Sequence, residues 1–129
     1  MTEFHESYQD YLKAIYIISK GKKGGWATNS EIANFLKVKP SSVTHMLYHL
    51  KEDKLISWNP RKSLRLTKKG KEIALDIIRN YKCLTEFFIR VLKLKNKKLV
   101  HKLSCEIEHH MIPELSNALE DLILEYQIN

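Results

Sequence analysis

The feature that most constrains this chain is the order of its periodic segments. Apolar residues at helical spacing predict a first helix between Tyr8 and Ile18, and a glycine-rich run after it ends that helix. Two short amphipathic helices are predicted next, at residues 29–37 and 40–53, with only a short turn between them. Because two short helices joined this closely share one small core, the chain is predicted to begin with a compact helical unit.

Local signals indicate where these two helices begin. Thr28, Asn29 and Ser30 offer side-chain oxygens that suit a helix N-cap, and Pro40 suits the first turn of the following helix. The apolar positions of that following helix recur every three or four residues, which predicts its inward face. These inward residues are Val43, Met46, Leu47 and Leu50.

A predicted β-hairpin follows the helices. Residues 55–58 and 63–66 are short strand-like runs, and the Asn-Pro-Arg-Lys sequence between them is typical of a turn with a basic tip. Three helices complete the prediction, at residues 68–92, 96–110 and 113–126, and Thr67 suits the cap of the first. The order helix, turn, helix, hairpin is that of a winged helix-turn-helix. The predicted fold class is therefore mainly α, a winged helix-turn-helix followed by an all-helical domain.

Charge is distributed unevenly along the 129 residues, whose net charge is +7. Residues 1–83 carry 16 Lys and Arg against 8 Asp and Glu, whereas residues 84–129 carry 6 against 7. A basic front half favours a polyanionic partner such as nucleic acid, although a solvated lysine-rich surface has the same composition. No apolar run approaches the roughly 20 residues that a membrane helix needs. Two cysteines are too few for a disulfide scaffold, so a cytoplasmic location is expected.

The helix predicted at 40–53 has the composition of a DNA-reading helix. Its outward positions near the start carry short or hydrogen-bonding groups without carboxylates, and a duplex major groove admits one α-helix. Cations on the hairpin would meet backbone phosphates. A plain three-helix unit with a hairpin is the alternative. The candidate DNA-contacting residues are Lys39, Pro40, Ser41, Ser42, Thr44, His45, Tyr48, Arg61, Lys62 and Arg65.

Two histidines on this helix have two interpretations. His45 and His49 are spaced i, i+4, which suits two ligands of one metal ion. Their place on the predicted reading helix favours contact with solvent or DNA instead. The spacing alone leaves both interpretations open.

A second group of reactive side chains lies on the helix predicted at 96–110. At roughly 100° per residue, four of them fall within one arc, across the helix from its apolar stripe. These four residues are His101, Cys105, Glu108 and His109. A thiolate, a carboxylate and an imidazole at this spacing can close around one divalent cation, and such mixed ligands suit Fe(II), Co(II), Ni(II), Zn(II) or Mn(II).

Other residues bear on this candidate site. Asp10 on the first helix lies off the apolar stripe and is a candidate further donor, whereas Glu106 and His110 fall outside the arc. The alternative is a polar helix face on which Cys105 is a half-buried apolar residue and His109 caps a helix end.

Three motifs follow one another along nearly the whole chain. They are Pro40-Ser41-Ser42-Val43-Thr44, Leu64-Arg65-Leu66-Thr67-Lys68-Lys69-Gly70 and Cys105-x-x-Glu108-His109. Together they resemble the diphtheria toxin repressor family of metal-dependent transcriptional repressors, in its short two-domain form. The resemblance implies a winged-helix DNA-binding domain, expected at residues 1–72, and a helical dimerisation and metal-binding domain, expected at residues 73–129.

The resemblance also implies which residues hold metal. The implied principal site comprises Asp10, Cys105, Glu108 and His109, and the implied ancillary site comprises Glu86 and His101. Asp10 is similar to manganese-type members and Cys105 to iron-type members, so Fe(II) or Mn(II) is the implied cofactor, with Zn, Co or Ni as substitutes in vitro. The chain departs from the family at Lys82, where a histidine is usual, and at Lys13, where manganese-type members have a carboxylate. We predict that Lys82 pairs with Glu86 and replaces a second cation.

The function implied by the resemblance is that of a regulator and not of an enzyme. Such a protein would bind a palindromic operator as a homodimer when metal is bound, and would control metal homeostasis genes. The implied partners are double-stranded DNA and a second copy of the chain, with no membrane and no small organic substrate. A winged-helix regulator that metal no longer controls is the alternative. A metalloenzyme is disfavoured because no separate base, lid or phosphate loop is found.

The second copy would join through the C-terminal helices, which are more apolar than one small core requires. The candidate seam residues are Phe87, Phe88, Ile89, Leu115, Leu119, Leu122 and Leu124.

Overall fold

The computed structural model describes residues 2–60 and 62–128, so Arg61 of the predicted hairpin tip lies outside the described residues. The chain divides into two compact units, one reaching to Leu75 and the other beginning at Asp76. We call them the N-terminal unit and the C-terminal unit. No helix among the described residues has both the length and the apolar character needed to cross a membrane.

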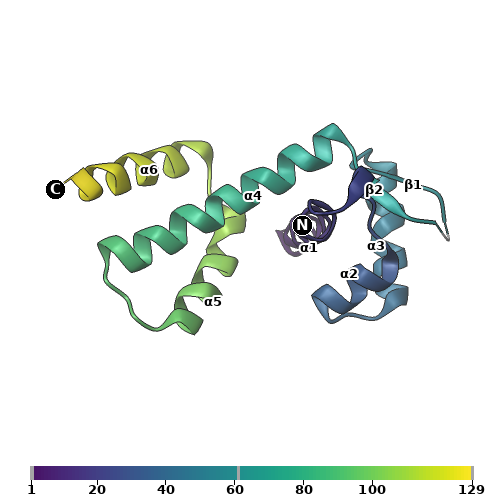
Figure 1. Ribbon diagram of the computed structural model, residues 1–129, viewed down its shortest axis with the longest axis horizontal. Coiled ribbons are helices and arrows are strands. Elements are labelled where there is room, and N and C mark those ends of the chain that lie inside the picture. Colours follow the sequence, from purple (N-terminus) through teal and green to yellow (C-terminus); the bar gives the residue numbers. More distant parts are fainter. Residues whose placement is uncertain (1, 61, 129) are drawn as a thin grey trace. The chain divides into compact units, whose positions relative to one another are not determined.

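The N-terminal unit contains three helices and a two-stranded sheet, and Figure 1 shows their order along the chain. Its elements are α1 (Thr2–Ser19), a 3-10 turn (Lys23–Gly25), α2 (Asn29–Leu36), α3 (Pro40–Glu52), β1 (Ile56–Trp58), β2 (Leu64–Leu66) and the first turns of α4 (Lys68–Glu86). Helix α2 packs against both α1 and α3, and α3 packs against β1. The predicted winged helix-turn-helix is therefore confirmed.

The ends of α2 and α3 follow the predicted signals. Of the three candidate caps, Thr28 is the N-cap of α2: its hydroxyl accepts from the Glu31 N–H at 3.2 Å, and its own N–H donates to the Glu31 carboxylate at 3.0 Å. Lys37 ends α2 in the left-handed conformation, with φ of 58°. Pro40 begins α3, where its missing N–H costs nothing.

The hairpin, which we call the wing, is anchored at both ends. Strands β1 and β2 are antiparallel, with Ser57 opposite Arg65, and Ala27 extends the sheet through two backbone hydrogen bonds to Leu64. At the exit, the Thr67 hydroxyl accepts from the Gly70 N–H at 3.2 Å and caps α4, as predicted. A side chain at Gly70 would bring its Cβ to 2.1 Å from the Leu55 carbonyl oxygen, so α4 approaches the wing closely because this residue is glycine.

One apolar core holds the N-terminal unit together. Side chains from α1, α2, α3, both strands and the start of α4 contribute to it. The four predicted inward residues of α3 are all buried in it, and Val43, Leu47 and Leu50 are 0% exposed. A closed core of this kind holds α3 and the wing in one fixed arrangement.

Among its described residues, the C-terminal unit contains helices and no strand, with short connections at residues 92–96 and 111–112. It contains the remainder of α4, a π-helical turn (Phe87–Val91), α5 (Lys97–Ile107), a 3-10 turn (Glu108–His110) and α6 (Pro113–Ile128). The predicted single helix at 68–92 is therefore interrupted: the Leu92 N–H donates to the Phe87 carbonyl at 3.1 Å, five residues back. The predicted helix at 96–110 likewise changes to 3-10 geometry at Glu108.

Candidate DNA interface and candidate metal ligands

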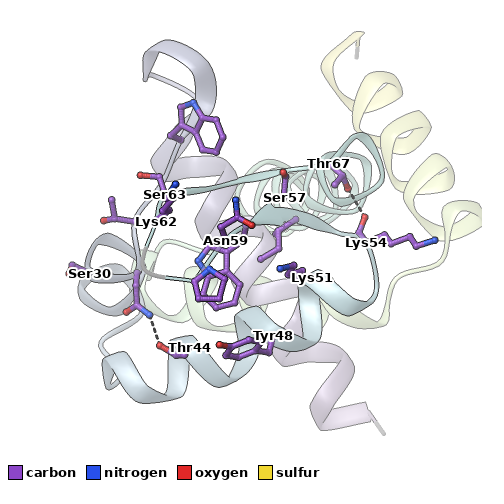
Figure 2. Close-up of a pocket in the computed structure, with 16 residues that line it drawn as sticks. Ser30, Thr44, Tyr48, Lys51, Lys54, Ser57, Asn59, Lys62, Ser63 and Thr67 are labelled. Atoms are coloured by element: carbon purple, nitrogen blue, oxygen red, sulfur yellow. Dashed lines mark hydrogen bonds between the residues drawn. The ribbon is translucent and has the colours of Figure 1, made fainter.

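An open groove of about 1360 Å³ lies between α3 and the wing, with the start of α2 at its edge. Figure 2 shows Thr44 and Tyr48 of α3 beside this groove, together with Asn59, Lys62 and Ser63 of the wing. Most of the lining residues are polar or basic, beside several aromatic and apolar ones, and the cations include Lys51, Lys54 and Lys62. The lysines and hydroxyl groups of the lining suit a polyanionic backbone lying against the groove.

The predicted DNA-contacting residues on α3 form an exposed row. Lys39, Pro40, Ser41, Ser42, His45 and Tyr48 are exposed, and Thr44 is half-buried. Two of these side chains are held in place. The Asn29 amide donates to the Thr44 hydroxyl at 2.9 Å, and the Tyr48 ring packs edge-on against Trp58 with ring centroids 4.9 Å apart. The outer face of α3 is thus braced by α2 on one side and by the wing on the other.

The wing places its predicted cations differently. Lys62 is exposed and lines the groove, whereas the Arg65 guanidinium lies 4.6 Å from the centroid of the Trp26 ring. An arginine stacked on an aromatic face keeps its outer N–H donors available to a second partner.

Sequence reasoning missed the contribution of α2 to the groove. The sequence predicts a capping role for Thr28, Asn29 and Ser30, and all three also line the groove. Among the described side chains, the Asn29 Oδ1 atom is buried without a hydrogen-bond partner. The available signal was the helix N-terminus itself, whose free N–H groups attract phosphate. Hydrogen bonds from Lys22 and Thr28 hold the pKa of Glu31, the next residue along α2, below its ordinary value, which favours its ionised form.

The residues predicted to bind metal lie on α1 and at the end of α5. Asp10 is exposed on α1, Cys105 is half-buried on α5, and Glu108 and His109 lie on the 3-10 turn that follows. Within the described residues, no group of three or more His, Cys, Asp or Glu side chains stands close enough to hold a metal ion. The proposed ligand set therefore stays a prediction.

A buried polar network fixes the turn that carries two of these residues. The Asn80 amide donates to the Glu108 main-chain carbonyl at 3.1 Å, and the Ser116 hydroxyl donates to Asn80 Oδ1 at 2.8 Å. Asn80 and Ser116 are themselves buried, so these bonds form away from solvent. Sequence reasoning missed Asn80, because nothing in its local sequence indicates a partner 28 and 36 residues away.

The donor chemistry at this turn fits a divalent transition metal. Glu108 is only 1% exposed, and its carboxylate lies in surroundings where the attraction to a cation is stronger than in water. A thiol and an imidazole flank it in sequence, which gives the sulfur, nitrogen and oxygen donors such ions accept. The other cysteine differs: burial raises the pKa of the Cys83 thiol, which disfavours the thiolate that would bind metal.

The predicted ancillary residues have other partners. His101 Nδ1 lies 2.7 Å from the Tyr81 hydroxyl, and its Nε2 lies 3.6 Å from Cys105 Sγ. Glu86 forms its ion pair with Arg90, at 3.6 Å, and not with Lys82. The prediction that Lys82 pairs with Glu86 is therefore wrong.

The fold and the groove are those of a winged helix-turn-helix protein. Two family models match the chain: the iron dependent repressor N-terminal DNA binding domain over residues 3–64, and the iron dependent repressor metal binding and dimerisation domain over residues 67–128. The chain belongs to the iron-dependent repressor family, whose members are metal-dependent transcriptional regulators and not enzymes. The predicted resemblance is thereby confirmed.

Individual relatives agree with this assignment. The chain is 34% identical over 121 residues to an HTH-type transcriptional regulator MntR of Geobacillus thermodenitrificans, covering 94% of this chain and 83% of that protein. An MntR of Bacillus velezensis is 32% identical over 121 residues, with 94% and 82% covered.

Solved structures show the same fold. The manganese regulator SloR is 25% identical with a TM-score of 0.74, and ScaR with bound Zn²⁺ is 27% identical with a TM-score of 0.75. In both cases 92% of this chain is covered but only 54% of the other chain. The present chain thus spans about half the length of these solved proteins.

Proposed function

We propose that this protein is a homodimeric repressor that binds a palindromic operator when it holds a divalent transition metal, and that it controls genes of metal homeostasis. The observation that carries the proposal is the braced outer face of α3, which has no carboxylate between Pro40 and Tyr48, beside a basic groove, in a chain of the iron-dependent repressor family. A location in the cytoplasm, where the DNA is found, belongs to the same proposal.

The residues proposed to contact DNA divide into two roles. Ser41, Ser42, Thr44, His45 and Tyr48 on α3 would meet base edges, because the start of a reading helix enters the major groove. Lys39, Pro40, Arg61, Lys62 and Arg65 would lie along the phosphates. We therefore expect Lys62→Ala to weaken binding to all sequences and to reduce the salt dependence, and Ser42→Ala to lower mainly the preference for the operator. Equal losses on operator and random DNA for both variants would contradict this division.

The proposed metal ligands are Asp10, Cys105, Glu108 and His109, with Glu86 and His101 as a weaker ancillary pair. When bound, the ion would supply the positive charge that neutralises two carboxylates and a thiolate. Asp10 belongs to the sequence of the DNA-binding domain, proposed at residues 1–72, and the other ligands to the dimerisation domain, proposed at 73–129. Metal would therefore favour DNA binding by its different affinity for the two states of the protein.

The nature of the metal belongs to the proposal as well. The names of the relatives favour Mn(II), whereas the thiol of Cys105 favours a softer ion such as Fe(II). Titration of the metal-free protein with each ion under anaerobic conditions, followed by operator binding, decides between them.

A matched set of variants tests the ligand assignment. Cys105→Ser and His109→Gln should each lower metal affinity by about 10- to 100-fold or more and reduce metal-activated operator binding in parallel. Glu106→Gln and His110→Gln, which change neighbouring exposed residues, are the controls and should bind metal like the original chain. Operator binding that is tight without metal and unchanged in all four variants would favour the alternative, a winged-helix regulator that metal no longer controls.

A further inference from the structure

The sequence spacing of His45 and His49 left open whether their side chains meet, and the structure shows how the two rings are arranged. His45 Nε2 and His49 Nε2 are 3.3 Å apart, whereas the centroids of the two rings are 4.7 Å apart. The two nitrogens are therefore the parts of the rings that converge. The ring planes cross at 78°, so the rings are not stacked face to face.

This separation suits two ligands of one tetrahedral ion. With Zn–N bonds of about 2.0–2.1 Å, two nitrogens 3.3 Å apart subtend an angle of about 104–111° at the metal, close to the tetrahedral value of about 109°. Without metal, the same separation is that of a long N–H···N hydrogen bond between the rings. The pair thus already has the separation between nitrogens that a bound ion would require, and a change in ring orientation would aim both lone pairs at that ion.

We propose that His45 and His49 form a second metal site, on α3, that takes a borderline divalent cation such as Zn(II). His45 is exposed and His49 half-buried, so the ion has access from solvent. The site shares no residue with the predicted ligand set of Asp10, Cys105, Glu108 and His109. With two imidazole ligands, it leaves its remaining coordination positions to water.

The ligand type determines which ions this site selects. Two imidazoles bind Zn(II), Ni(II) and Cu(II) well, whereas Mn(II) prefers oxygen donors and lies at the weak end of the divalent series. The site therefore binds Zn(II), Ni(II) or Cu(II) when such an ion is in excess, and it stays unoccupied when only Mn(II) is present.

The consequence for DNA binding rests on the proposed function. His45 is one of the proposed base-contacting residues, and an ion on its Nε2 atom removes that atom from hydrogen bonding with a base edge. Because the ion also brings positive charge to the DNA-facing surface, non-specific attraction to phosphate is not lost. Zinc at this site therefore lowers the protein's preference for the operator over random DNA. It does not abolish the protein's overall affinity for DNA.

Calorimetry on the full chain tests the site directly. Zn(II) titrated into the original protein should bind with one more equivalent per subunit than into the double variant His45→Gln/His49→Gln. His110→Gln, which removes an exposed histidine of the C-terminal unit, is the matched control and should keep the original stoichiometry. Mn(II) titrations should give the same stoichiometry for all three proteins. Equal zinc stoichiometry in the original chain and the double variant would overturn the proposal, whatever the protein does with DNA.

His49→Gln alone tests the regulatory consequence, because it removes one ligand and keeps the proposed base contact of His45. With the protein saturated in Mn(II), added Zn(II) should lower the ratio of operator to random-DNA affinity by about tenfold in the original chain and leave it unchanged in His49→Gln. An equal zinc effect in both proteins would overturn this consequence. If neither protein prefers the operator even with Mn(II), the proposed function fails while the calorimetric result still decides on the zinc site.

Discussion

The two units differ in how completely each buries its own apolar residues. Among the described residues, sixteen apolar side chains are buried in the N-terminal unit, but only five in the C-terminal unit. Large apolar side chains show the reverse distribution, since five are exposed in the N-terminal unit and eight in the C-terminal unit. The N-terminal unit therefore has a complete apolar core, whereas the C-terminal unit has an incomplete core with much of its apolar surface exposed.

Buried polar groups sharpen the contrast. Among the described residues of the C-terminal unit, Asn80, Ser104, Glu108 and Ser116 are buried, and hydrogen bonds connect several of them. Such bonds fix relative positions but supply less driving force than apolar burial does. The difference teaches that the N-terminal unit can be rigid alone, and that the C-terminal unit needs a further apolar surface to complete its core.

The largest expected effect concerns that missing surface. On α6, Leu115, Leu122 and Tyr126 are spaced i, i+7, i+11 and are 39–44% exposed, so they form one apolar stripe. We expect Leu115→Glu/Leu122→Glu to leave the protein monomeric. The variant removes two leucines from each subunit and so four from the dimer, and each leucine contributes at most about 1.5–3 kcal/mol on full burial. Because the single chain leaves Leu115 43% and Leu122 39% exposed, a dimer covers only that part, and association should weaken by roughly 10²-fold or more. Sedimentation over a range of protein concentrations measures the change.

The N-terminal unit offers the control for this variant. Phe35 is 48% exposed on α2, yet its unit already has a complete core. Phe35→Glu should leave the mass in solution that of the original chain. If Phe35→Glu dissociated the protein and the α6 variant did not, the N-terminal unit would be the one that supplies the dimer interface. That result would contradict the contrast between the two units.

The second prediction concerns the close contact between α4 and the wing in the N-terminal unit. Gly70→Ala forces a Cβ against the Leu55 carbonyl oxygen, so the backbone must move, and we expect a loss of about 3 kcal/mol in the free energy of unfolding. Gly21→Ala is the control, since nothing lies within 4 Å of the added Cβ there. Urea unfolding at one fixed protein concentration compares the two. A Gly70→Ala protein as stable as Gly21→Ala would show that the wing is not held this tightly.

Local chemistry explains why so much of the fold could be predicted. Helix caps such as Thr28 and Thr67 and the apolar spacing of α3 each act within a few residues of their own position. Their outcome therefore follows from the sequence. The π-helical turn at Phe87–Val91 was not predicted, because its apolar spacing continues that of α4 and no glycine or proline indicates a break.

The sequence predicted which types of residue stand near one another in the candidate sites. It did not predict which of these side chains contact each other. Glu86 has a cation four residues away on either side, Lys82 before it and Arg90 after it, and spacing alone does not choose between them. The structure pairs it with Arg90, the orientation in which the acid precedes the base along the helix and which helices favour. Likewise, i, i+4 spacing did not reveal that the nitrogens of His45 and His49 converge, since that depends on side-chain rotamers.

The third prediction tests whether buried hydrogen bonds hold the C-terminal unit. Asn80→Ala removes two buried hydrogen bonds, one to the Glu108 carbonyl and one from the Ser116 hydroxyl, so we expect a loss of about 2 kcal/mol in the free energy of unfolding. Asn117→Ala is the control, because Asn117 is exposed and contacts only the exposed end of Arg79 among the bonds described. If the two variants unfolded at the same urea concentration, the network would not be what positions the turn at Glu108.

The smallest effect concerns one surface ion pair in each unit. A hydrogen bond from Lys22 lowers the pKa of Glu31, and a hydrogen bond from Arg79 lowers the pKa of Glu120. A carboxyl whose pKa is lower in the folded state stabilises the fold above the pKa of the unfolded chain, and this contribution is lost as the pH falls through the folded pKa. All four side chains are more than a third exposed, so solvent screens both pairs and the change in stability is small.

The pKa values themselves distinguish the two pairs more sharply than stability does. In Lys22→Met the pKa of Glu31 should rise only part of the way toward its ordinary value, because the Thr28 hydroxyl and N–H still hydrogen-bond its carboxylate in the capping box. In Arg79→Met the pKa of Glu120 should return to the ordinary range, since the hydrogen bond to the Cys83 thiol is opposed by desolvation. Carboxyl chemical shifts followed by NMR between about pH 2 and 7 measure both values. A full return of the pKa at Glu31 would show that the α2 cap does not hold its carboxylate. A pKa that stays low at Glu120 would show that groups other than Arg79 stabilise its ionised form.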